Sequence, residues 1–398
     1  MHTPLEPPST YQDALRWLFA QTRSGAPRDA ERMRRLMARL ELTHPPNAVH
    51  VVGTNGKGSV TAMLAAGLEA AGVKTGRFIS PHVVDFRERT AVGGCWVSEA
   101  DVLGFVRTLP ELEPPPAFFE LTFALALEHF AREEVEMAVV EAGVGARHDA
   151  TRVLENVRAV VITNVGRDHL DTLGPTLEDV ARDKADAVRP GVPTVTAASG
   201  EALEIVAAVA AERGGPLYVL SPHDPLFELP AGLEAPPAQT LNRRLAAGTL
   251  RLLGVPEAAV PQGLKATLPA RAEQFVVGDR EVILDGAHNP DAARALLGHA
   301  RTPFTLLFGA LPKKLGADTL GVLLPYAEHV VLTDAAPGQT STLQGPGLTF
   351  IPEPGAALNE ALGRTPAGRQ VVVAGSFYLA GRLRPRLLEL GGARGCSR

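Results

Sequence analysis

Residues 50 to 59 form the segment of this chain that is best suited to bind phosphate. They read His-Val-Val-Gly-Thr-Asn-Gly-Lys-Gly-Ser, between an apolar run and a helical pattern that starts at Val60. Glycines allow backbone N–H groups to approach an anion closely. Lys57 can reach the outer phosphates of a nucleotide, and Ser59 can contact the magnesium ion bound to them. We therefore predict a phosphate-binding loop between a strand and a helix.

The spacing of this loop differs from that of the common P-loop. In the common motif a glycine stands at the position of Val51, and a serine or threonine follows the lysine directly, where this chain has Gly58. An ordinary glycine-rich turn between a strand and a helix is therefore the alternative. The predicted strand before the loop and the predicted helix after it favour phosphate binding.

Two other predicted strands end in loops that carry acidic side chains. Glu141 stands at the carboxyl end of one strand, where open α/β sheets bind ligands, and a carboxylate there can hold magnesium. The alternative is an exposed acid before a turn. Residues 162–169 repeat the arrangement and end in Asp168 and His169. Because magnesium prefers oxygen ligands, His169 on its own is better interpreted as a structural or hydrogen-bonding histidine.

Two more segments combine a predicted element with a residue that can do chemistry. Lys184 lies late in a predicted helix, residues 177–188, and this pattern alone predicts a solvated surface lysine. Asp285 follows an apolar strand and can accept a hydrogen bond from a ribose hydroxyl or an ammonium group. An Asp-Gly turn followed by a helix that starts at Pro290 is the alternative there.

Short β-rich runs alternate with helical patterns along most of the chain, which predicts α/β doubly wound sheets. Several runs are almost continuous Val, Ile and Leu, as expected for parallel strands that are covered on both faces. The predicted strands are 48–53, 74–79, 136–141, 159–164, 193–197, 281–284, 304–308, 329–333 and 370–374. The predicted helices are 60–71, 99–108, 120–132, 177–188, 201–212, 240–253 and 291–300.

The chain is predicted to fold as two domains rather than around one large sheet. Residues 255–271 are short of strand signals and rich in proline, and a new strand–loop–helix unit follows them. We place the boundary near residues 269–274. The expected domains are a large P-loop-type doubly wound α/β domain, residues 1–270, and a smaller Rossmann-like α/β domain, residues 271–398.

The composition predicts a soluble cytoplasmic protein. Of the 398 residues, 45% are hydrophobic and 21% are charged, so large cores are expected rather than disorder. The net charge of −5, without a long basic block, argues against nucleic acid as a partner. Two cysteines far apart in the sequence fit a reducing compartment. We find no secretion signal and no apolar run of membrane-spanning length, so no membrane partner is expected.

Taken together, these segments resemble the folylpolyglutamate synthase/dihydrofolate synthase family of the Mur ligase superfamily. The resemblance runs from about His50 to Gly381. Any one motif would be weak evidence, but so many in the family's order make a chance match remote. The motifs are Gly53–Ser59, Ser80–His82 with Glu88–Arg89, Phe119–Thr122, Glu141–Thr151, Ile162–His169 with Leu173–Gly174 and Thr176, Lys184–Ala185, Asp285–Pro290 and Gly375–Leu379.

The resemblance implies roles for individual residues. The implied catalytic residues are Lys57, Lys184 and His288, and Lys184 would carry an N-carboxylate that supports a second magnesium ion. The implied magnesium ligands are Ser59, Ser80, Glu141 and His169. The implied ATP contacts are Thr54, Asn55, Gly56, Lys57, Gly58, Ser59, Asn242, Arg271, Asp285, His288 and Asn289. The implied substrate contacts are Arg89, Phe119, Glu120, Thr122, Arg147 and Asp149.

The implied activity is ATP-dependent ligation of L-glutamate to dihydropteroate, to reduced folates or to both, through an acyl phosphate. Closure of two domains on ATP would exclude water from this intermediate, and His288 is a candidate base for the glutamate amine. The expected ligands are ATP, two magnesium ions and these small molecules, and a monomer is expected. The alternatives are a Mur-type ligase with another carboxylate substrate and a non-catalytic ATP-binding module.

The chain departs from the family pattern at several loop positions. Ala146, Asp186 and Ala270 each stand where the family has glycine, and Arg152 stands where it has asparagine. The family's Asp-Lys-Asp loop reads Pro-Lys-Lys-Leu at residues 312–315. These changes bear on loop geometry and substrate preference, and they leave the phosphate loop and the implied metal positions unchanged.

Overall fold

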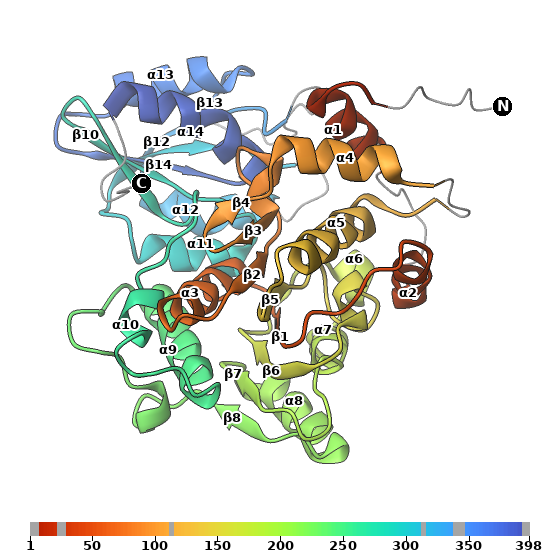
Figure 1. The fold of residues 1–398 in the computed structure, drawn as a ribbon. Coiled ribbons are helices and arrows are strands. Elements are labelled where there is room, and N and C mark those ends of the chain that lie inside the picture. The colour runs from red at the N-terminus through yellow and green to blue at the C-terminus, as the bar shows by residue number, and fades with distance from the viewer. Residues whose placement is uncertain (1–7, 22–28, 111–114, 312–315, 337–346, 392–398) are drawn as a thin grey trace. The chain divides into compact units, whose positions relative to one another are not determined.

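The computed structural model divides into two compact units (Figure 1). It describes residues 8–21, 29–110, 115–311, 316–336 and 347–391. Unit 1 comprises residues 1–81, 86–234 and 239–266, and unit 2 comprises residues 82–85, 235–238 and 267–398. The predicted division at residue 270 stays a prediction, and each unit is described by itself below.

Unit 1 is built on an eight-stranded sheet of order β4-β3-β2-β5-β1-β6-β7-β8. From β2 to β8 the strands are parallel, and β3 and β4 add an antiparallel edge. The strands are β1 (Ala48–Val52), β2 (Thr75–Phe78), β3 (Thr90–Val92), β4 (Cys95–Trp96), β5 (Met137–Glu141), β6 (Val157–Ile162), β7 (Thr194–Thr196) and β8 (Leu217–Val219). The central strand β1 is buried throughout, as expected for a parallel strand covered on both faces.

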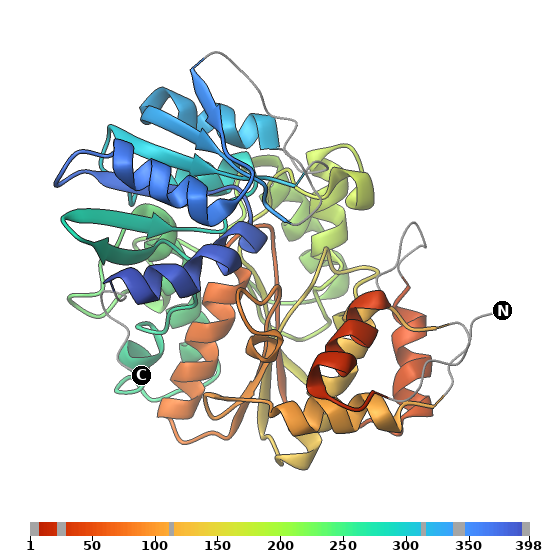
Figure 2. The same cartoon turned by 90° about the horizontal axis from the view of Figure 1, so that it is seen from above.

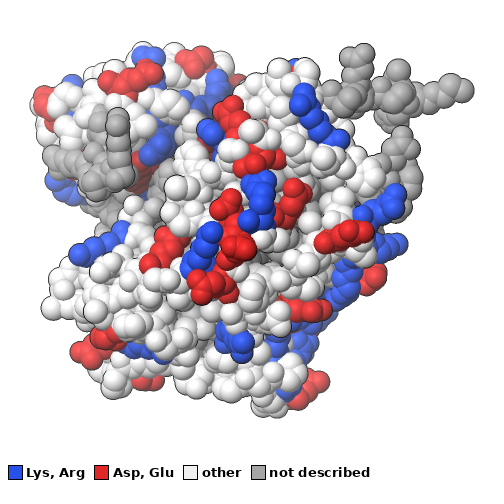
Figure 3. Space-filling view, viewed as in Figure 1, with Lys and Arg blue, Asp and Glu red and all other residues white. Residues whose placement is uncertain are grey.

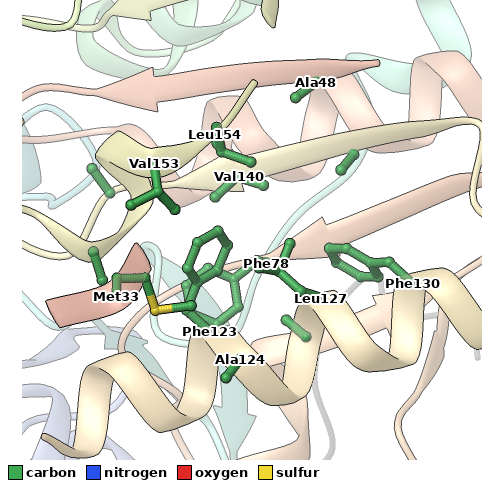
Figure 4. Packing of buried hydrophobic residues seen from close by; sticks show 14 of the residues in the cluster. Met33, Ala48, Phe78, Phe123, Ala124, Leu127, Phe130, Val140, Val153 and Leu154 are labelled. Atoms are coloured by element: carbon green, nitrogen blue, oxygen red, sulfur yellow. The ribbon is translucent and has the colours of Figure 1, made fainter. Parts of the chain in front are cut away.

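Helices cover both faces of this sheet (Figures 1 and 2). Alternate residues of β1 enter two cores: Val49 and Val51 pack with α3, α9 and α10, while Ala48 and Val52 pack with α1, α2, α4 and α5. Figure 4 shows the second core, in which Phe123, Leu127 and Phe130 of α5 lie against the sheet. The helices are α1 (Tyr11–Ala20), α2 (Ala30–Arg39), α3 (Lys57–Ala70), α4 (Glu99–Thr108), α5 (Phe118–Arg132), α6 (Leu170–Leu173), α7 (Leu177–Ala185), α8 (Gly200–Arg213), α9 (Pro237–Leu252) and α10 (Val260–Gly263).

Unit 2 is built on a six-stranded sheet of order β13-β12-β11-β14-β10-β9. All neighbours are parallel except β9 and β10, which form a hairpin. The strands are β9 (Glu273–Val277), β10 (Arg280–Leu284), β11 (Phe304–Phe308), β12 (Ala327–Leu332), β13 (Leu348–Phe350) and β14 (Gln370–Ala374). The helices α11 (Pro290–Leu297), α12 (Gly316–Leu323), α13 (Pro354–Arg364) and α14 (Phe377–Gly391) complete two cores, one on each face.

The predicted α/β fold class is confirmed. Every predicted strand and helix is present, three of them with the predicted ends (99–108, 304–308 and 370–374) and the others with shifted ends. One shift changes the site, because α3 begins at Lys57 and not at Val60, so the lysine stands in the first helical turn. Within the described ranges, the helices lack the length and apolar character that a membrane-spanning helix needs. On the face drawn in Figure 3, acidic and basic side chains are interspersed rather than gathered by sign.

Candidate active site

The loop between β1 and α3 has a backbone that only glycine can supply at two positions. Gly53 has φ 141° and Gly56 has φ 84°. A Cβ atom at Gly53 would lie 1.9 Å from Thr163 Oγ1, and one at Gly56 would lie 2.3 Å from Asn242 Oδ1. Gly58, in contrast, lies inside α3 with helical geometry. The close approach brings Asn242, an implied ATP contact from α9, directly against the loop.

Residues just beyond β6 hold this loop through its backbone. Asn164 accepts from the N–H of Thr54 through its carbonyl oxygen at 3.0 Å, and from the N–H of Asn55 through Oδ1 at 2.9 Å. Thr163 Oγ1 donates to the Asn55 carbonyl at 2.7 Å, and Thr54 Oγ1 accepts from the N–H of Gly166 at 2.9 Å. These contacts fix the loop before any ligand binds. Neither Thr163 nor Asn164 was predicted from the sequence as a site residue.

Two lysine side chains converge on one carbonyl oxygen of the loop. Lys57 Nζ donates to the carbonyl oxygens of Gly53 and Thr54, both at 3.1 Å. Lys184 Nζ, from α7, donates to the Gly53 carbonyl at 3.0 Å. Only 3% of Lys184 is exposed, so the surface position predicted from the helical pattern alone is wrong. Burial, reinforced by the neighbouring Lys57 ammonium, lowers the pKa of Lys184 to about 7.

The implied magnesium ligands lie at the ends of neighbouring strands. Glu141 ends β5 and is 2% exposed, which excludes the alternative of an exposed acid. Its Oε2 atom accepts from the N–H of Ser80, just beyond β2, at 3.0 Å. Ser59 lies in the first turn of α3. His169 directly precedes α6 with φ 52°, and its Nε2 atom lies 3.9 Å from Asp168 Oδ2.

These residues suit a magnesium ion that takes its remaining ligands from a bound nucleotide and from water. Among the described residues, no three His, Cys, Asp or Glu side chains come together as a metal cluster. Magnesium is commonly held by one or two carboxylates plus phosphate oxygens and water, rather than by an all-protein cage. The buried Glu141 carboxylate beside Ser80 meets that requirement. The individual metal ligands stay predictions.

Three of the implied substrate residues, Phe119, Glu120 and Thr122, lie on α5. A Cβ atom at Gly143 would lie 2.7 Å from the tip of the Phe119 ring, so this glycine makes room for the ring beside the loop. Thr122 Oγ1 donates to the Phe119 carbonyl at 2.9 Å. Glu120 is buried, and its Oε2 atom accepts from the N–H of Ala117 at 2.7 Å. Their substrate contacts stay predictions.

Arg89, another implied substrate residue, is also buried. Its guanidinium carbon lies 5.1 Å from the centre of the Phe118 ring, in a cation–π contact. Phe118 begins α5, and Arg89 ends a short 3₁₀ helix before β3. The structure therefore places Arg89 beside the start of α5, which also carries Phe119 and Glu120.

In unit 2, the ring of Phe377 packs against three residues near the carboxyl end of the sheet. The Arg271 guanidinium carbon lies 4.4 Å from the ring centre, and the His288 ring lies edge-on with 5.7 Å between centroids. A Cβ atom at Gly286 would lie 2.2 Å from the Phe377 ring. His288 Nδ1 lies 2.8 Å from the Gly286 carbonyl, which can only accept, so Nδ1 carries the proton.

Asp285 and Asn289 organise the same segment. The Asp285 carboxylate accepts from the N–H groups of Ala272 and Ala287, both at 2.7 Å. Burial raises the pKa of Asp285, while Arg271 opposes the shift. Asn289 caps α11 through the N–H of Ala292 at 2.8 Å, and the helix begins at Pro290 as predicted. The local geometry is an Asp-Gly turn followed by a helix start, as the alternative interpretation of this segment predicted. The ATP contacts of Asp285 and Asn289 stay predictions.

Comparison with known proteins decides the family. Residues 51–191 match the model of the Mur ligase middle domain, and residues 270–377 match that of the Mur ligase glutamate ligase domain. A relative from Bacillus subtilis, named dihydrofolate synthase/folylpolyglutamate synthase, is 32% identical over 77% of this chain and 81% of its own. This chain belongs to the folylpolyglutamate synthase/dihydrofolate synthase family. The predicted resemblance is confirmed, and with it the enzyme class, a Mur-type ligase.

Solved structures of this family match almost the whole chain. Escherichia coli FolC in complex with DHPP and ADP is 28% identical, with a TM-score of 0.83 over 96% of this chain and 99% of that one. The Yersinia pestis bifunctional folylpolyglutamate synthase/dihydrofolate synthase, complexed with AMPPNP and a manganese ion, is 28% identical. Its TM-score is 0.79 over 97% of this chain and all of that one. Family members thus bind ATP analogues together with a divalent metal.

At two positions where the chain departs from the expected family pattern, Asp186 forms ion pairs through its side chain and Ala146 donates a hydrogen bond through its backbone. Asp186, in place of glycine, pairs with Arg213 and also with Arg147, whose Nε atom lies 3.4 Å from Asp186 Oδ2. The N–H of Ala146 donates to Asp183 Oδ1 at 2.7 Å. Arg147 therefore forms an ion pair with Asp186 in this structure. The substrate contact implied for Arg147 stays a prediction. The departure at residues 312–315 lies outside the described residues.

Replacing Phe377 by leucine is expected to raise KM for ATP with little change in kcat. A cation–π contact is worth about 1 kcal/mol, so its loss from Arg271 corresponds to a rise of roughly fivefold. Steady-state kinetics with varied ATP would measure it. Tyr378→Leu is the matched control, because Tyr378 is 63% exposed. An unchanged KM in Phe377→Leu would contradict the positioning of Arg271 by this ring.

Proposed function

We propose that this chain is an ATP-dependent ligase that joins L-glutamate to dihydropteroate, to reduced folates or to both, through an acyl-phosphate intermediate. The observation that carries this proposal is the meeting of Lys57 and Lys184 at the Gly53 carbonyl of the phosphate loop. The loop has the geometry to cradle phosphate oxygens, and α3 presents its amino end to the same place. The names of the family's members support the choice of substrates.

The chemistry requires an activated acid, because a carboxylate is a poor electrophile. The loop N–H groups and Lys57 would bind the transferred phosphoryl group and offset its charge, which lowers the barrier to transfer onto the carboxylate. Asn242 would bind the nucleotide beside Gly56. A divalent metal, when bound, neutralises phosphate charge, and Glu141 and Ser80 would hold it. We also propose the second ion and the N-carboxylated Lys184.

The glutamate amine must lose a proton when it attacks the acyl phosphate. We propose His288 as the group that takes it, since the proton on Nδ1 leaves Nε2 as the basic nitrogen of the neutral ring.

The same proposal includes a monomeric protein in the cytoplasm. Light scattering of the purified protein would test the monomer.

An ADP-release assay tests the proposed function. The purified protein would be given ATP, magnesium and L-glutamate with dihydropteroate, and in a parallel reaction with tetrahydrofolate. ADP release that requires both the amino acid and one of the pterin compounds supports the proposal. Release that requires a different carboxylic acid would indicate another Mur-type ligase. If the protein binds ATP but releases no ADP under any of these conditions, it would be a non-catalytic ATP-binding module.

A further inference from the structure

His50 is a buried histidine on the strand that leads into the phosphate loop. It lies in the middle of β1 with 0% of its surface exposed. Its Nε2 atom lies 2.9 Å from Oγ1 of Thr151, a residue 101 positions further along the chain. A buried polar side chain on a central strand needs such a partner, because leaving the group unpaired costs free energy.

The partners of Thr151 fix which nitrogen of His50 carries the proton. Thr151 Oγ1 donates its single proton to Asp149 Oδ1 at 2.6 Å. It can therefore only accept from His50, so Nε2 of the histidine is protonated. Among the residues that the structure describes, none hydrogen-bonds to His50 Nδ1. Burial, together with the charges of Arg189 and Arg152, lowers the pKa of His50 to about 3, which keeps the ring neutral.

His50, Thr151 and Asp149 form a hydrogen-bonded relay. The Asp149 carboxylate at its end organises the loop after β5. Its Oδ1 atom also accepts from the N–H of Thr151 at 3.0 Å, and its Oδ2 atom accepts from the N–H of Val144 at 3.0 Å. The carboxylate thus joins both ends of the segment 144–151. His50 is the only member of this relay that lies on β1, so it ties the segment to the sheet.

We propose that His50 is a positioning residue that sets Asp149, through Thr151, in the orientation needed to bind the pterin-bearing acid. This inference rests on the proposed function and on the substrate contact that the family resemblance implies for Asp149. A carboxylate whose oxygens are held by several donors keeps one orientation and can meet donor groups of a ligand without reorganising. In this proposal the relay acts on the acid substrate, because its hydrogen bonds end on Asp149 and its members lie outside the phosphate loop.

Thr151→Val tests the relay, because valine keeps the shape of threonine and removes the hydroxyl. We expect KM for dihydropteroate to rise about tenfold, equivalent to ~1.4 kcal/mol, with KM for ATP within about twofold of the wild-type value. Thr151→Ser and His50→Gln retain the donors and are the matched controls, with KM for dihydropteroate expected near that of the wild type. A defect caused only by loosened packing would change kcat and both KM values together. Such a parallel change, or an unchanged KM for dihydropteroate, would overturn the proposal.

Nitrogen-15 NMR of the wild-type protein gives a readout that does not depend on activity or on the folding of a variant. We expect the His50 ring at pH 7 to be the neutral form protonated at Nε2, with its signals assigned by their loss in His50→Gln. The other tautomer, or a charged ring, would overturn the relay. A wild-type protein without folate-dependent ADP release would instead overturn the proposed function, and it would do so whatever the NMR result.

Discussion

Lys57→Ala is expected to abolish ATP turnover while the protein remains folded. Lys57 stands in the first turn of α3 and its ammonium lies over the loop, on the carbonyls of Gly53 and Thr54. Its ammonium group is placed to stabilise the negative charge that develops on the transferred phosphoryl group. Removal of one such preorganised donor costs about 100- to 1,000-fold in kcat. ADP release at saturating substrates would measure the loss.

The fold should tolerate this change, because alanine is the best helix former and Lys57 is only partly buried. Thermal unfolding would confirm that the variant is folded. Lys74→Ala is the matched control: Lys74 lies on the same unit, its side chain is 45% exposed, and its ion pair with Glu133 spans 3.8 Å. If Lys57→Ala retained more than a tenth of wild-type turnover, the assignment of the phosphate loop would be wrong.

The phosphate loop could be predicted from sequence because its determinants are local. An apolar strand, two glycines with positive φ and a helix start all lie within residues 48 to 70. Neighbouring residues alone therefore reveal the turn, and only the start of the helix was placed too late. The same reasoning found Pro290 as the first residue of α11.

The partners that hold the loop lie too far away in the sequence for local patterns to reveal them. Thr163 and Lys184 reach it across 108 and 131 residues. One signal was present for Thr163, since it directly follows an apolar strand and the carboxyl ends of parallel strands share one edge. The sequence also held a signal that Lys184 is buried. It lies four residues after the buried Val180 and therefore on the same face of α7.

Some of the elements that were not predicted are very short, although β9 and α14, which were also not predicted, have 5 and 15 residues. The strands β3, β4, β8 and β13 have only two or three residues each, so they offer no run for a pattern to detect. The helix α1 does carry a local signal, because Thr10 and Asp13 form a capping box at its start. Pairing within the sheet, rather than intrinsic preference, makes the short segments strands.

Lys184→Ala is expected to lower turnover by about 100-fold or more, comparable with the loss of a preorganised donor. Lys184 is almost fully buried and its Nζ atom contacts the same Gly53 carbonyl as Lys57. Among the described residues, Lys184 Nζ hydrogen-bonds to the Gly53 carbonyl and to no carboxylate. Burying such a group beside a second lysine is costly, so we expect it to serve the reaction. Removing it should leave the protein folded, which thermal unfolding would check.

Chemical rescue separates two explanations of that loss. If Lys184 acts as an N-carboxylate, formate or acetate should restore part of the activity of Lys184→Ala, because the small acid replaces the missing carboxylate. If it acts as an ammonium, a small amine should restore activity instead. Lys57→Ala, treated with the same acids, is the control and should not recover. Full activity of Lys184→Ala without any added acid would show that Lys184 has no role in catalysis.

The ionisation of Lys184 gives the proposed carboxylation a pH dependence with a definite sign. Only the neutral amine reacts with CO2, and burial lowers the pKa of Lys184 to about 7, so much of it is neutral at pH 7. The neutral fraction falls as the pH drops below 7, and carboxylation should fall with it. Carbon-13 NMR in labelled bicarbonate should therefore show a carbamate signal in the wild type that weakens on acidification and is missing from Lys184→Ala. A wild type without this signal at pH 8, yet fully active in CO2-free buffer, would leave Lys184 as an amine donor to the Gly53 carbonyl.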